Sequence, residues 1–275
     1  MSNCDTCPSK NNCNTEASTC GIKNNPHNNV KHIIGVMSGK GGVGKSTVAA
    51  MIAEDLNSKG YSVGIMDADI TGPSIPRLLN ISDKRAYAVE EGLLPVETEN
   101  GIKVVSLNLL MEDENQPVIW RGPIIASLVE QFWTEVYWGE LDYLIIDMPP
   151  GTGDVALTVM QSIPLSGIIM VSVPQDLVSM IVSKAINMVN KMNIPVLGVV
   201  ENMSYVKCPD CGKKIQIFET DNIDGFLGEN NIKLLGELPM SKDLAGISQD
   251  NRPILDEEIQ KTFENIGKSI VEDLS

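Results

Sequence analysis

The sequence has little basic charge. Its 275 residues include 21 Lys and Arg against 36 Asp and Glu, which gives a formal net charge of −15 at pH 7. Binding to the phosphate backbone of a nucleic acid, or to an anionic membrane surface, needs clustered Lys and Arg, and the sequence contains no such cluster. We therefore expect neither a nucleic acid nor a membrane as a standing partner.

Long apolar runs are absent as well. None approaches the roughly eighteen residues of a membrane span, and the polar N-terminus lacks the pattern of a secretory signal. These absences favour a cytoplasmic protein. In a reducing cytosol the six cysteines are more often ligands or free thiols than disulfides, and a chain of this length buries a core that needs no disulfide.

The chain divides into a short irregular tail and one larger domain. Residues 1–30 hold four of the six cysteines, many Asn and Ser, and almost no apolar periodicity. In residues 31–275 short apolar runs alternate with helical patterns. The pattern predicts strands at 32–37, 62–67, 103–108, 142–147, 167–173, 195–201 and 233–237, and helices at 45–59, 122–138, 154–162, 176–192 and 256–273.

Several of the predicted strands are apolar throughout. The runs 143–146 and 167–171 show no alternation between apolar and polar residues. Strands that are buried on both faces have this composition. The sequence therefore predicts a three-layer α/β fold, in which a mostly parallel sheet has helices on both faces. Ligands of such sheets bind at the carboxyl ends of the strands, where the motifs described next are located.

A glycine-rich segment with two lysines is the most informative motif. Residues 38–47 read Ser-Gly-Lys-Gly-Gly-Val-Gly-Lys-Ser-Thr and contain the phosphate-binding pattern G-x-x-x-x-G-K-[ST]. Its backbone N–H groups turn toward phosphates, Lys45 reaches the β- and γ-phosphate oxygens, and the Ser46 hydroxyl binds Mg²⁺. The apolar run before it and the helix after it favour a nucleotide site over a flexible turn. The expected nucleotide-binding residues here are Gly39, Lys40, Gly41, Gly42, Val43, Gly44, Lys45, Ser46 and Thr47.

Acidic residues follow two of the predicted strands. Asp67 and Asp69 end the strand 62–67, and their spacing predicts that both point the same way. One would act near Mg²⁺ and the other would orient an attacking water molecule, although such residues also cap ordinary turns. Asp147 follows the strand 142–147 and begins the Gly- and Pro-rich stretch 147–154, which can shift when a γ-phosphate is lost.

Cys208 and Cys211 form a C-x-x-C pair followed by Gly212. This spacing brings two thiolates to one metal ion or cluster, and the glycine permits a tight turn. Two ligands do not complete a four-ligand site, and no second pair of this kind lies downstream. A partner chain or the N-terminal cysteines would have to supply the remaining ligands, or the pair would serve as a redox dithiol.

The loop with two lysines resembles the deviant Walker A motif of the family that contains the nitrogenase iron protein and the MinD and ParA ATPases. In that family the first lysine crosses a dimer interface to the partner's nucleotide. The resemblance implies a nucleotide-dependent homodimer in which Lys40 acts in trans. It also implies that Asp69 orients the water, that Asp147 is the Walker B carboxylate, and that Asn202, at the end of the strand 195–201, contacts adenine.

Further motifs carry a closer resemblance. In chain order they are 38–47, 67–70 with 72–76, 121–123, 147–154, 174–175, 201–204, 208–212 and 238–239. Together they are similar to the Mrp/ApbC family of iron–sulfur cluster carrier ATPases, from about residue 30 to the C-terminus. The resemblance implies slow, Mg²⁺-dependent ATP hydrolysis, with Pro239 at the nucleotide. It also implies a labile [4Fe–4S] cluster held between two subunits by Cys208 and Cys211, and delivery of that cluster to apo iron–sulfur proteins.

The tail cysteines Cys4, Cys7, Cys13 and Cys20 have the spacing C-x2-C-x5-C-x6-C. The first three match the N-terminal set of the eukaryotic cytosolic scaffold relatives, which ends in C-x2-C-x5-C. The earlier cysteine of that set is missing here, so Cys20 would have to take its place. We expect a second cluster in the tail, with a zinc site or unliganded thiols as the alternatives.

Two rival functions follow from the same motifs. The first is a positioning ATPase of the MinD/ParA type with a structural zinc at the C-x-x-C pair. Such a protein would be expected to have a basic amphipathic C-terminal helix or a basic face, and residues 266–275 are acidic at their end. The second is a non-enzymatic dimer stabilised by zinc, because four thiolates suit Zn²⁺ as well as an iron–sulfur cluster.

Overall fold

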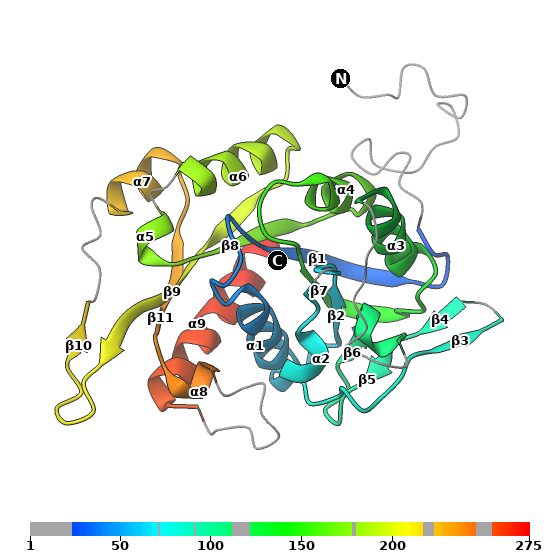
Figure 1. Ribbon diagram of the computed structural model, residues 1–275, viewed down its shortest axis with the longest axis horizontal. Coiled ribbons are helices and arrows are strands. Elements are labelled where there is room, and N and C mark those ends of the chain that lie inside the picture. Colours follow the sequence, from blue (N-terminus) through cyan, green and yellow to red (C-terminus); the bar gives the residue numbers. More distant parts are fainter. Residues whose placement is uncertain are drawn as a thin grey trace.

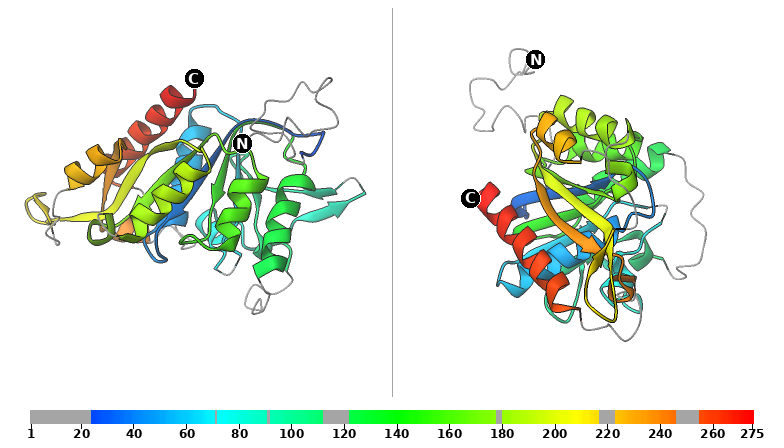
Figure 2. Two further views of the ribbon diagram at one scale, coloured as in Figure 1. Left: turned by 90° about the horizontal axis from the view of Figure 1, so that it is seen from above. Right: turned by 90° about the vertical axis from the view of Figure 1, so that its left-hand side faces the viewer.

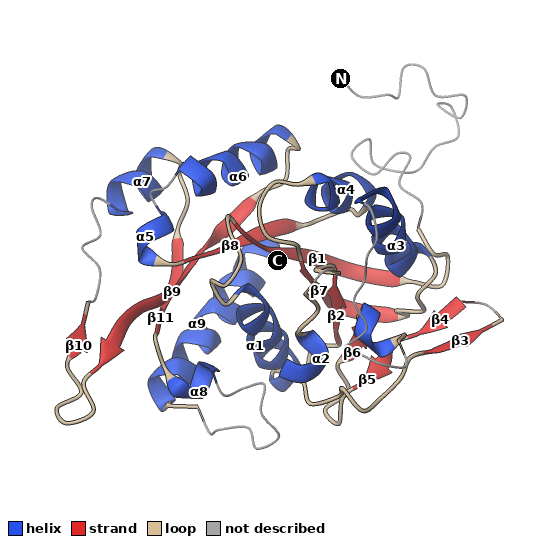
Figure 3. Cartoon of the chain, in the orientation of Figure 1, coloured by secondary structure: helices blue, strands red, loops and turns tan. Residues whose placement is uncertain are grey.

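The computed structural model describes residues 24–70, 72–90, 92–111, 122–177, 180–216, 223–245 and 255–275. In these residues a twisted sheet lies between two layers of helices, as the sequence predicts (Figure 1). Figure 3 shows the strands running through the middle of the molecule with helices above and below. The predictions for Cys4, Cys7, Cys13 and Cys20 lie outside the described residues.

Nine strands of the described chain form the main sheet, in the order β10-β9-β8-β1-β7-β2-β6-β5, and β11 also pairs with β9. Seven run parallel, and they are β1 (Asn29–Ser38), β2 (Val63–Asp67), β6 (Lys103–Val105), β7 (Glu140–Asp147), β8 (Gly167–Ser172), β9 (Val196–Lys207) and β11 (Leu234–Pro239). The two antiparallel additions are β5 (Val96–Glu97) and β10 (Lys214–Ile215).

Helices cover each face of the sheet over a separate apolar core. One face carries α1 (Lys45–Ser58) and α9 (Glu257–Leu274), and the other carries α3 (Gly122–Thr134), α4 (Asp154–Ser162) and α6 (Met180–Lys191). Figure 2 shows α6 and α9 on opposite sides of the strands. The shorter helices are α2 (Ile75–Leu78), α5 (Pro174–Leu177), α7 (Ile223–Glu229) and α8 (Lys242–Ala245).

The central strand β1 explains the apolar runs. Ile34 and Val36 face the core under α1 and α9, whereas Ile33 and Met37 face the core under α3, α4 and α6. Successive side chains of a strand point to opposite faces, and here both faces are covered. Every position must therefore be apolar, which is why the sequence shows no alternation.

The C-terminal helix α9 lies close against α1. Ile259, Phe263, Ile266 and Ile270 are buried in the core that α1 shares. Gly267 permits the close approach, because a Cβ atom there would collide with the Asp55 carboxylate of α1. The apolar face of α9 is thus used inside the fold. None of the described helices has the length and apolar character needed to cross a membrane.

Some predicted bounds are wrong. The helix predicted at 122–138 ends at Thr134, because Trp138 turns back and its indole N–H donates to Phe132 O at 3.0 Å. In the described residues the helix predicted at 176–192 corresponds to the end of α5 and to α6, on either side of residues 178–179, and the strand predicted at 103–108 ends at Val105.

The strands at the margins of the main sheet, and a separate two-stranded sheet, also differ from the predictions. The strand predicted to end at 201 continues to Lys207, because β11 and β10 pair with its second half. The hairpin of β3 (Tyr87–Val89) and β4 (Gly92–Leu94) was not predicted, nor were β5 and β10. These four strands are two or three residues long, which is too short to show a periodic pattern.

Candidate functional site

The phosphate-binding loop joins the end of β1 to the start of α1 (Figure 1). Gly42 and Gly44 have φ values of 80° and 83°, in the left-handed region that glycine adopts without strain. At Gly44 a Cβ atom would also collide with the side-chain amide of Asn202. Helix α1 starts at Lys45, so the positive end of its dipole faces the loop.

Lys45 is the centre of a buried ion cluster. Its Nζ lies 2.5 Å from Asp147 Oδ1 and 3.5 Å from Asp69 Oδ2, and 6% of its side chain is exposed. Ser46 Oγ lies 3.4 Å from the same Nζ. Three predicted catalytic residues therefore come together from α1, from the segment after β2 and from the end of β7.

Asp147 is fully buried at the end of β7. Burial raises the pKa of this carboxyl, while the charge of Lys45 acts in the opposite direction. Its Oδ2 has no hydrogen-bond partner in the described part of the chain. A buried carboxylate oxygen of this kind needs a donor, and a water molecule in the shell of a bound Mg²⁺ supplies one. Together with the adjacent Ser46 hydroxyl, Asp147 fits the predicted Mg²⁺ site.

Asp67 and Asp69 differ in their partners, although the charges of Lys45 and Asp147 act on both. Asp69 pairs with Lys45, whereas Asp67 accepts hydrogen bonds from Ser106 Oγ at 3.0 Å and from the backbone N–H groups of Asp69 and Ile75. Strand β2 ends at Asp67, so strand alternation no longer applies two residues later. Burial, and then the charge of Asp147, raise the pKa of Asp67 to about 8. Asp67 holds the loop that carries Asp69.

Lys40 lies on the exposed side of the phosphate-binding loop, outside the buried ion cluster. Ser38 Oγ, at the start of the loop, donates a hydrogen bond to the backbone carbonyl oxygen of Lys40 at 2.9 Å. The role of Lys40 in trans remains a prediction, and its exposed position is compatible with it.

Asn202 contacts the phosphate-binding loop from β9, which is separated from β1 by β8. Its Nδ2 donates to Val43 O at 2.9 Å, and its Oδ1 accepts from the N–H of Met203. Pro239 is buried at the end of β11, where its register partner on β9 is Tyr205. Pro239 also lines a cavity of about 400 Å³, with Lys207, Pro209, Met240, Ser241, Lys242, Asp256, Glu258 and Ile259.

Cys208 and Cys211 lie in the turn between β9 and β10, which we call the cysteine turn (residues 208–213). Cys208 is half-buried, Cys211 is exposed, and both thiols are free. Cys208 N donates to Lys213 O, and Gly212 N donates to Cys208 O. The backbone N–H groups of Cys211 and Asp210 lower the pKa of Cys208, which favours the metal-binding thiolate. Within the described ranges, no group of three or more His, Cys, Asp and Glu residues could hold a metal ion.

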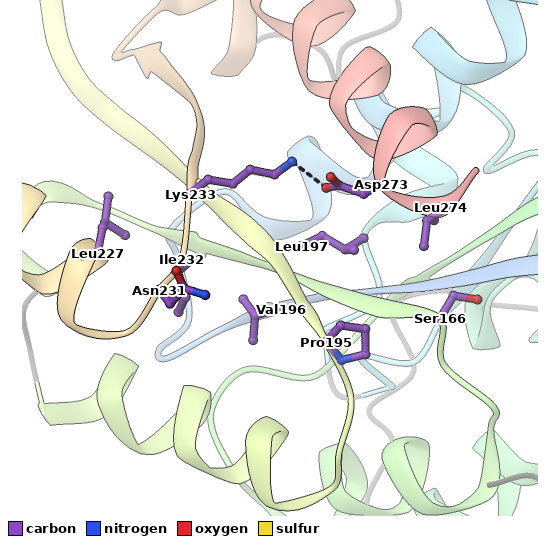
Figure 4. Close-up of a pocket in the computed structure, with 11 residues that line it drawn as sticks. Ser166, Pro195, Val196, Leu197, Leu227, Asn231, Ile232, Lys233, Asp273 and Leu274 are labelled. Atoms are coloured by element: carbon purple, nitrogen blue, oxygen red, sulfur yellow. Dashed lines mark ion pairs between the residues drawn. The ribbon is translucent and has the colours of Figure 1, made fainter.

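A larger cavity lies at the amino ends of the strands, where β8, β9 and β11 begin (Figure 4). Its volume is about 600 Å³. Lys233 and Asp273 form an ion pair of 2.6 Å at its rim, as Figure 4 shows. Because the predicted site residues lie at the carboxyl ends of the strands, this cavity is separate from the candidate site. Its lining residues are Ser166, Pro195, Val196, Leu197, Leu227, Gly228, Asn231, Ile232, Lys233, Asp273 and Leu274.

Comparison with known proteins decides the family. Residues 29–275 match the family model ParA, described as NUBPL iron-transfer P-loop NTPase. The chain belongs to this family. This NUBPL-type NTPase is 48% identical over 258 residues to the iron-sulfur cluster carrier protein of Clostridium perfringens, covering 89% of this chain and 90% of that protein. The predicted family resemblance is confirmed.

Solved structures agree with this assignment. The nucleotide-binding protein from Archaeoglobus fulgidus in complex with ADP is 40% identical, with a TM-score of 0.71 over 82% of the NUBPL-type chain and 93% of its own. MinD in the MinC:MinD complex of Aquifex aeolicus is 18% identical, with a TM-score of 0.63 over 88% of this chain and 96% of its own. At that identity the likeness to MinD shows the shared fold alone.

Two features of the candidate site and its surroundings were not found from the sequence. Ser106 bonds to Asp67 only because β6 pairs with β2, and no local motif marks it. Asp256 and Glu258 approach Lys207 from a helix that is distant in sequence. A capping aspartate before α9 was the one available signal, and it does not indicate what else the residue contacts.

Proposed function

We propose that this protein is an ATP-dependent iron–sulfur cluster carrier. It binds a [4Fe–4S] cluster between two subunits and transfers it to apo-proteins in the cytosol. One observation carries the proposal. A single strand, β9, contacts the phosphate-binding loop through Asn202 and leads directly into a turn with two free thiols. The relative from Clostridium perfringens, named iron-sulfur cluster carrier protein, supports the same function.

In the proposed reaction the loop backbone and Lys45 bind the phosphates of ATP. Ser46 and Asp147 would hold Mg²⁺, Asp147 through the oxygen that has no protein partner in the described residues. The ion would neutralise the negative charge that develops on the phosphates. Asp69, fixed by the loop that Asp67 holds, orients the attacking water molecule. Lys40 reaches the nucleotide of the other subunit.

The cluster is the cargo of this reaction rather than a fixed part of the protein. Each chain supplies Cys208 and Cys211, and a two-fold dimer brings four thiolates to one axis. The exposure of Cys211 suits a cluster that must leave, because a client protein's thiols need to reach the iron. The backbone N–H groups of Cys211 and Asp210 lower the pKa of Cys208, which favours the thiolate form that binds iron.

The experiment is anaerobic reconstitution of the full chain with its four tail cysteines changed to Ser. About four iron and four sulfide per dimer are expected, with visible absorbance from thiolate-to-iron charge transfer. Cys208→Ala and Cys211→Ala should lose the iron. A double variant that keeps full iron and sulfide would contradict the proposal, and stoichiometric zinc in place of iron would favour the zinc-stabilised dimer.

Lys40→Ala tests the ATPase half of the proposal. We expect this variant to bind nucleotide and lose turnover, because its charge serves the partner's transition state. Asp69→Asn should behave in the same way. Titration with a fluorescent ATP analogue and a phosphate-release assay separate the two effects. If Lys40→Ala hydrolyses ATP at the wild-type rate, Lys40 is not part of the catalytic site.

The second proposed cluster is in the N-terminal tail. If Cys4, Cys7, Cys13 and Cys20 bind one cluster in each chain, the unmodified dimer holds about three clusters, of which one bridges the subunits. Cys20→Ala is the decisive variant, because its cysteine departs from the matched spacing. A wild-type iron content in Cys20→Ala would exclude it as a ligand.

A further inference from the structure

We infer that Lys207 and Lys214 are positioning residues for the cysteine turn, which they fasten to the N-terminus of α9. The inference rests on the proposed cluster site and adds to it the residues that set the direction of the thiolates. The four charged residues Lys207, Lys214, Asp256 and Glu258 are called the clamp below.

The clamp is a closed set of contacts. Lys207 Nζ lies 3.2 Å from Asp256 Oδ2 and 3.2 Å from Glu258 Oε2, and Lys214 Nζ lies 2.8 Å from Glu258 Oε1. Tyr205 adds two contacts: its hydroxyl donates to Glu258 Oε1 at 3.3 Å, and its ring centroid lies 4.2 Å from Lys214 Nζ. Glu258 is therefore shared by both lysines and by the tyrosine.

The two lysines form the base of the cysteine turn. Lys207 directly precedes Cys208, and Lys214 is its register partner across the β9–β10 ladder. Like charges directly opposite each other in an antiparallel pair repel, so these strands would separate without counter-charges. Asp256 and Glu258 provide the counter-charges. The N–H of Glu258 and the charge of Lys207 lower the pKa of Asp256, and Lys214 and Lys207 lower the pKa of Glu258, so both carboxylates are charged at neutral pH.

The other side of the clamp is firmly anchored. Asp256 caps α9 by accepting from the N–H of Glu258 at 2.9 Å, and the helix continues into the core with Phe263 and Ile266. Alongside it runs α1, the helix that starts at Lys45, and Lys59 Nζ donates to Glu264 O between the two helices. The cysteine turn is thus fixed relative to the helix that begins at the phosphate-binding loop.

A cluster shared by two chains needs both turns in one orientation. Thiolates held on rigid supports keep their ligand geometry, whereas a loosened turn lets one iron–sulfur bond open before the other three. Each exposed ion pair of the clamp is individually weak, but the shared carboxylate makes the set a network. Loss of the clamp should therefore speed release of the cluster without removing a ligand.

The test compares lysines in the full, cluster-loaded protein. In Lys214→Ala an iron chelator should bleach the visible absorbance roughly two- to fivefold faster than in the wild type. Lys214→Arg should restore the wild-type rate, since Arg can pair with Glu258 and stack on Tyr205. The matched control is Lys233→Ala, which removes an ion pair of 2.6 Å at the other end of the strands, where β11 begins. It should not change the bleaching rate. Added salt should speed bleaching of the wild type more than of Lys214→Ala.

A second measurement needs no cluster. Hydrogen–deuterium exchange of the peptide 205–216 in cluster-free protein should be faster in Lys214→Ala and normal in Lys233→Ala. Wild-type exchange and bleaching in Lys214→Ala would overturn the inference, as would faster exchange with unchanged bleaching. If the wild type binds no iron, the proposed function fails while the exchange experiment still decides whether the clamp holds the turn.

Discussion

The two lysine–carboxylate clusters of this protein, one around Lys45 and the other around Lys207, differ in burial. Lys45 is 6% exposed and pairs with a fully buried Asp147, whereas Lys207 is 41% exposed and pairs with carboxylates at the surface. A buried charge is tolerated only while it is paired, so the first cluster is part of the fold. Exposed pairs contribute little to stability, and the second cluster can be adjusted without unfolding the protein.

Lys45→Ala should have the largest effect. It leaves Asp147 buried without its cation, which we expect to lower the free energy of unfolding by about 3 kcal/mol and to abolish nucleotide binding. Urea unfolding and nucleotide titration measure the two losses. Lys31→Ala is the control, because it removes a pair of 2.7 Å whose lysine is 62% exposed, and it should lower the free energy of unfolding far less. Equal losses would contradict the comparison.

Gly44→Ala should have the next largest effect. Its φ of 83° and the collision with Asn202 add to each other, and we expect a loss of about 1–3 kcal/mol together with weaker nucleotide binding. Gly212→Ala is the matched change in the cysteine turn, where φ is 70° and a Cβ atom meets nothing within 4 Å. It should cost only the backbone strain, about 1 kcal/mol. Thermal melting of both variants checks the order.

Carboxyl groups at the two clusters should respond to pH with opposite signs: Asp67, which lies beside the buried cluster, and the two carboxyls of the clamp. The folded pKa of Asp67, about 8, lies above its unfolded value of about 4, so folding takes up a proton between these values. Stability from this group is present at low pH and is lost as the pH rises from about 4 to about 8. Asp67→Asn should flatten that decline in urea midpoints measured across the range. If stability declines as steeply with pH in Asp67→Asn as in the wild type, the decline is due to another group.

Asp256 and Glu258 provide the opposite sign. Their folded pKa values are lowered by the N–H of Glu258 and by the clamp lysines, so their contribution is present at neutral pH. It is lost as the pH falls through the folded values. In Lys214→Ala this acid-side loss should be smaller than in the wild type.

The smallest expected effect on stability is that of Cys211→Ala. Its thiol is exposed, and we expect a change within about 0.5 kcal/mol in cluster-free protein, even though the iron content should fall. Urea unfolding under reducing conditions measures the first quantity and an iron assay the second. A large loss of stability would mean that the turn is part of the folding core.

The parts that sequence reasoning found are those encoded locally. The glycines of the phosphate-binding loop, Lys45 and Ser46 lie within one contiguous segment. The apolar composition of β1 indicates that both of its faces are buried. What it missed depends on pairing between distant segments. The extension of β9 to Lys207 follows from β10 and β11, and the clamp joins Lys207 to Asp256 across 49 residues. Asp67 shows the same limit, because its partner Ser106 comes from another strand.

The continuity of β9 ties the spacing of the two sites to a parity rule. Beyond the register shift between Glu201 and Tyr205, each successive side chain of β9 turns to the opposite face, so one residue inserted between Tyr205 and Cys208 would invert the cysteine turn relative to the sheet. Two inserted residues would preserve the face and move the thiols outward by about 7 Å. The number of residues between Tyr205 and Cys208 is therefore fixed twice, once as a length and once as odd or even.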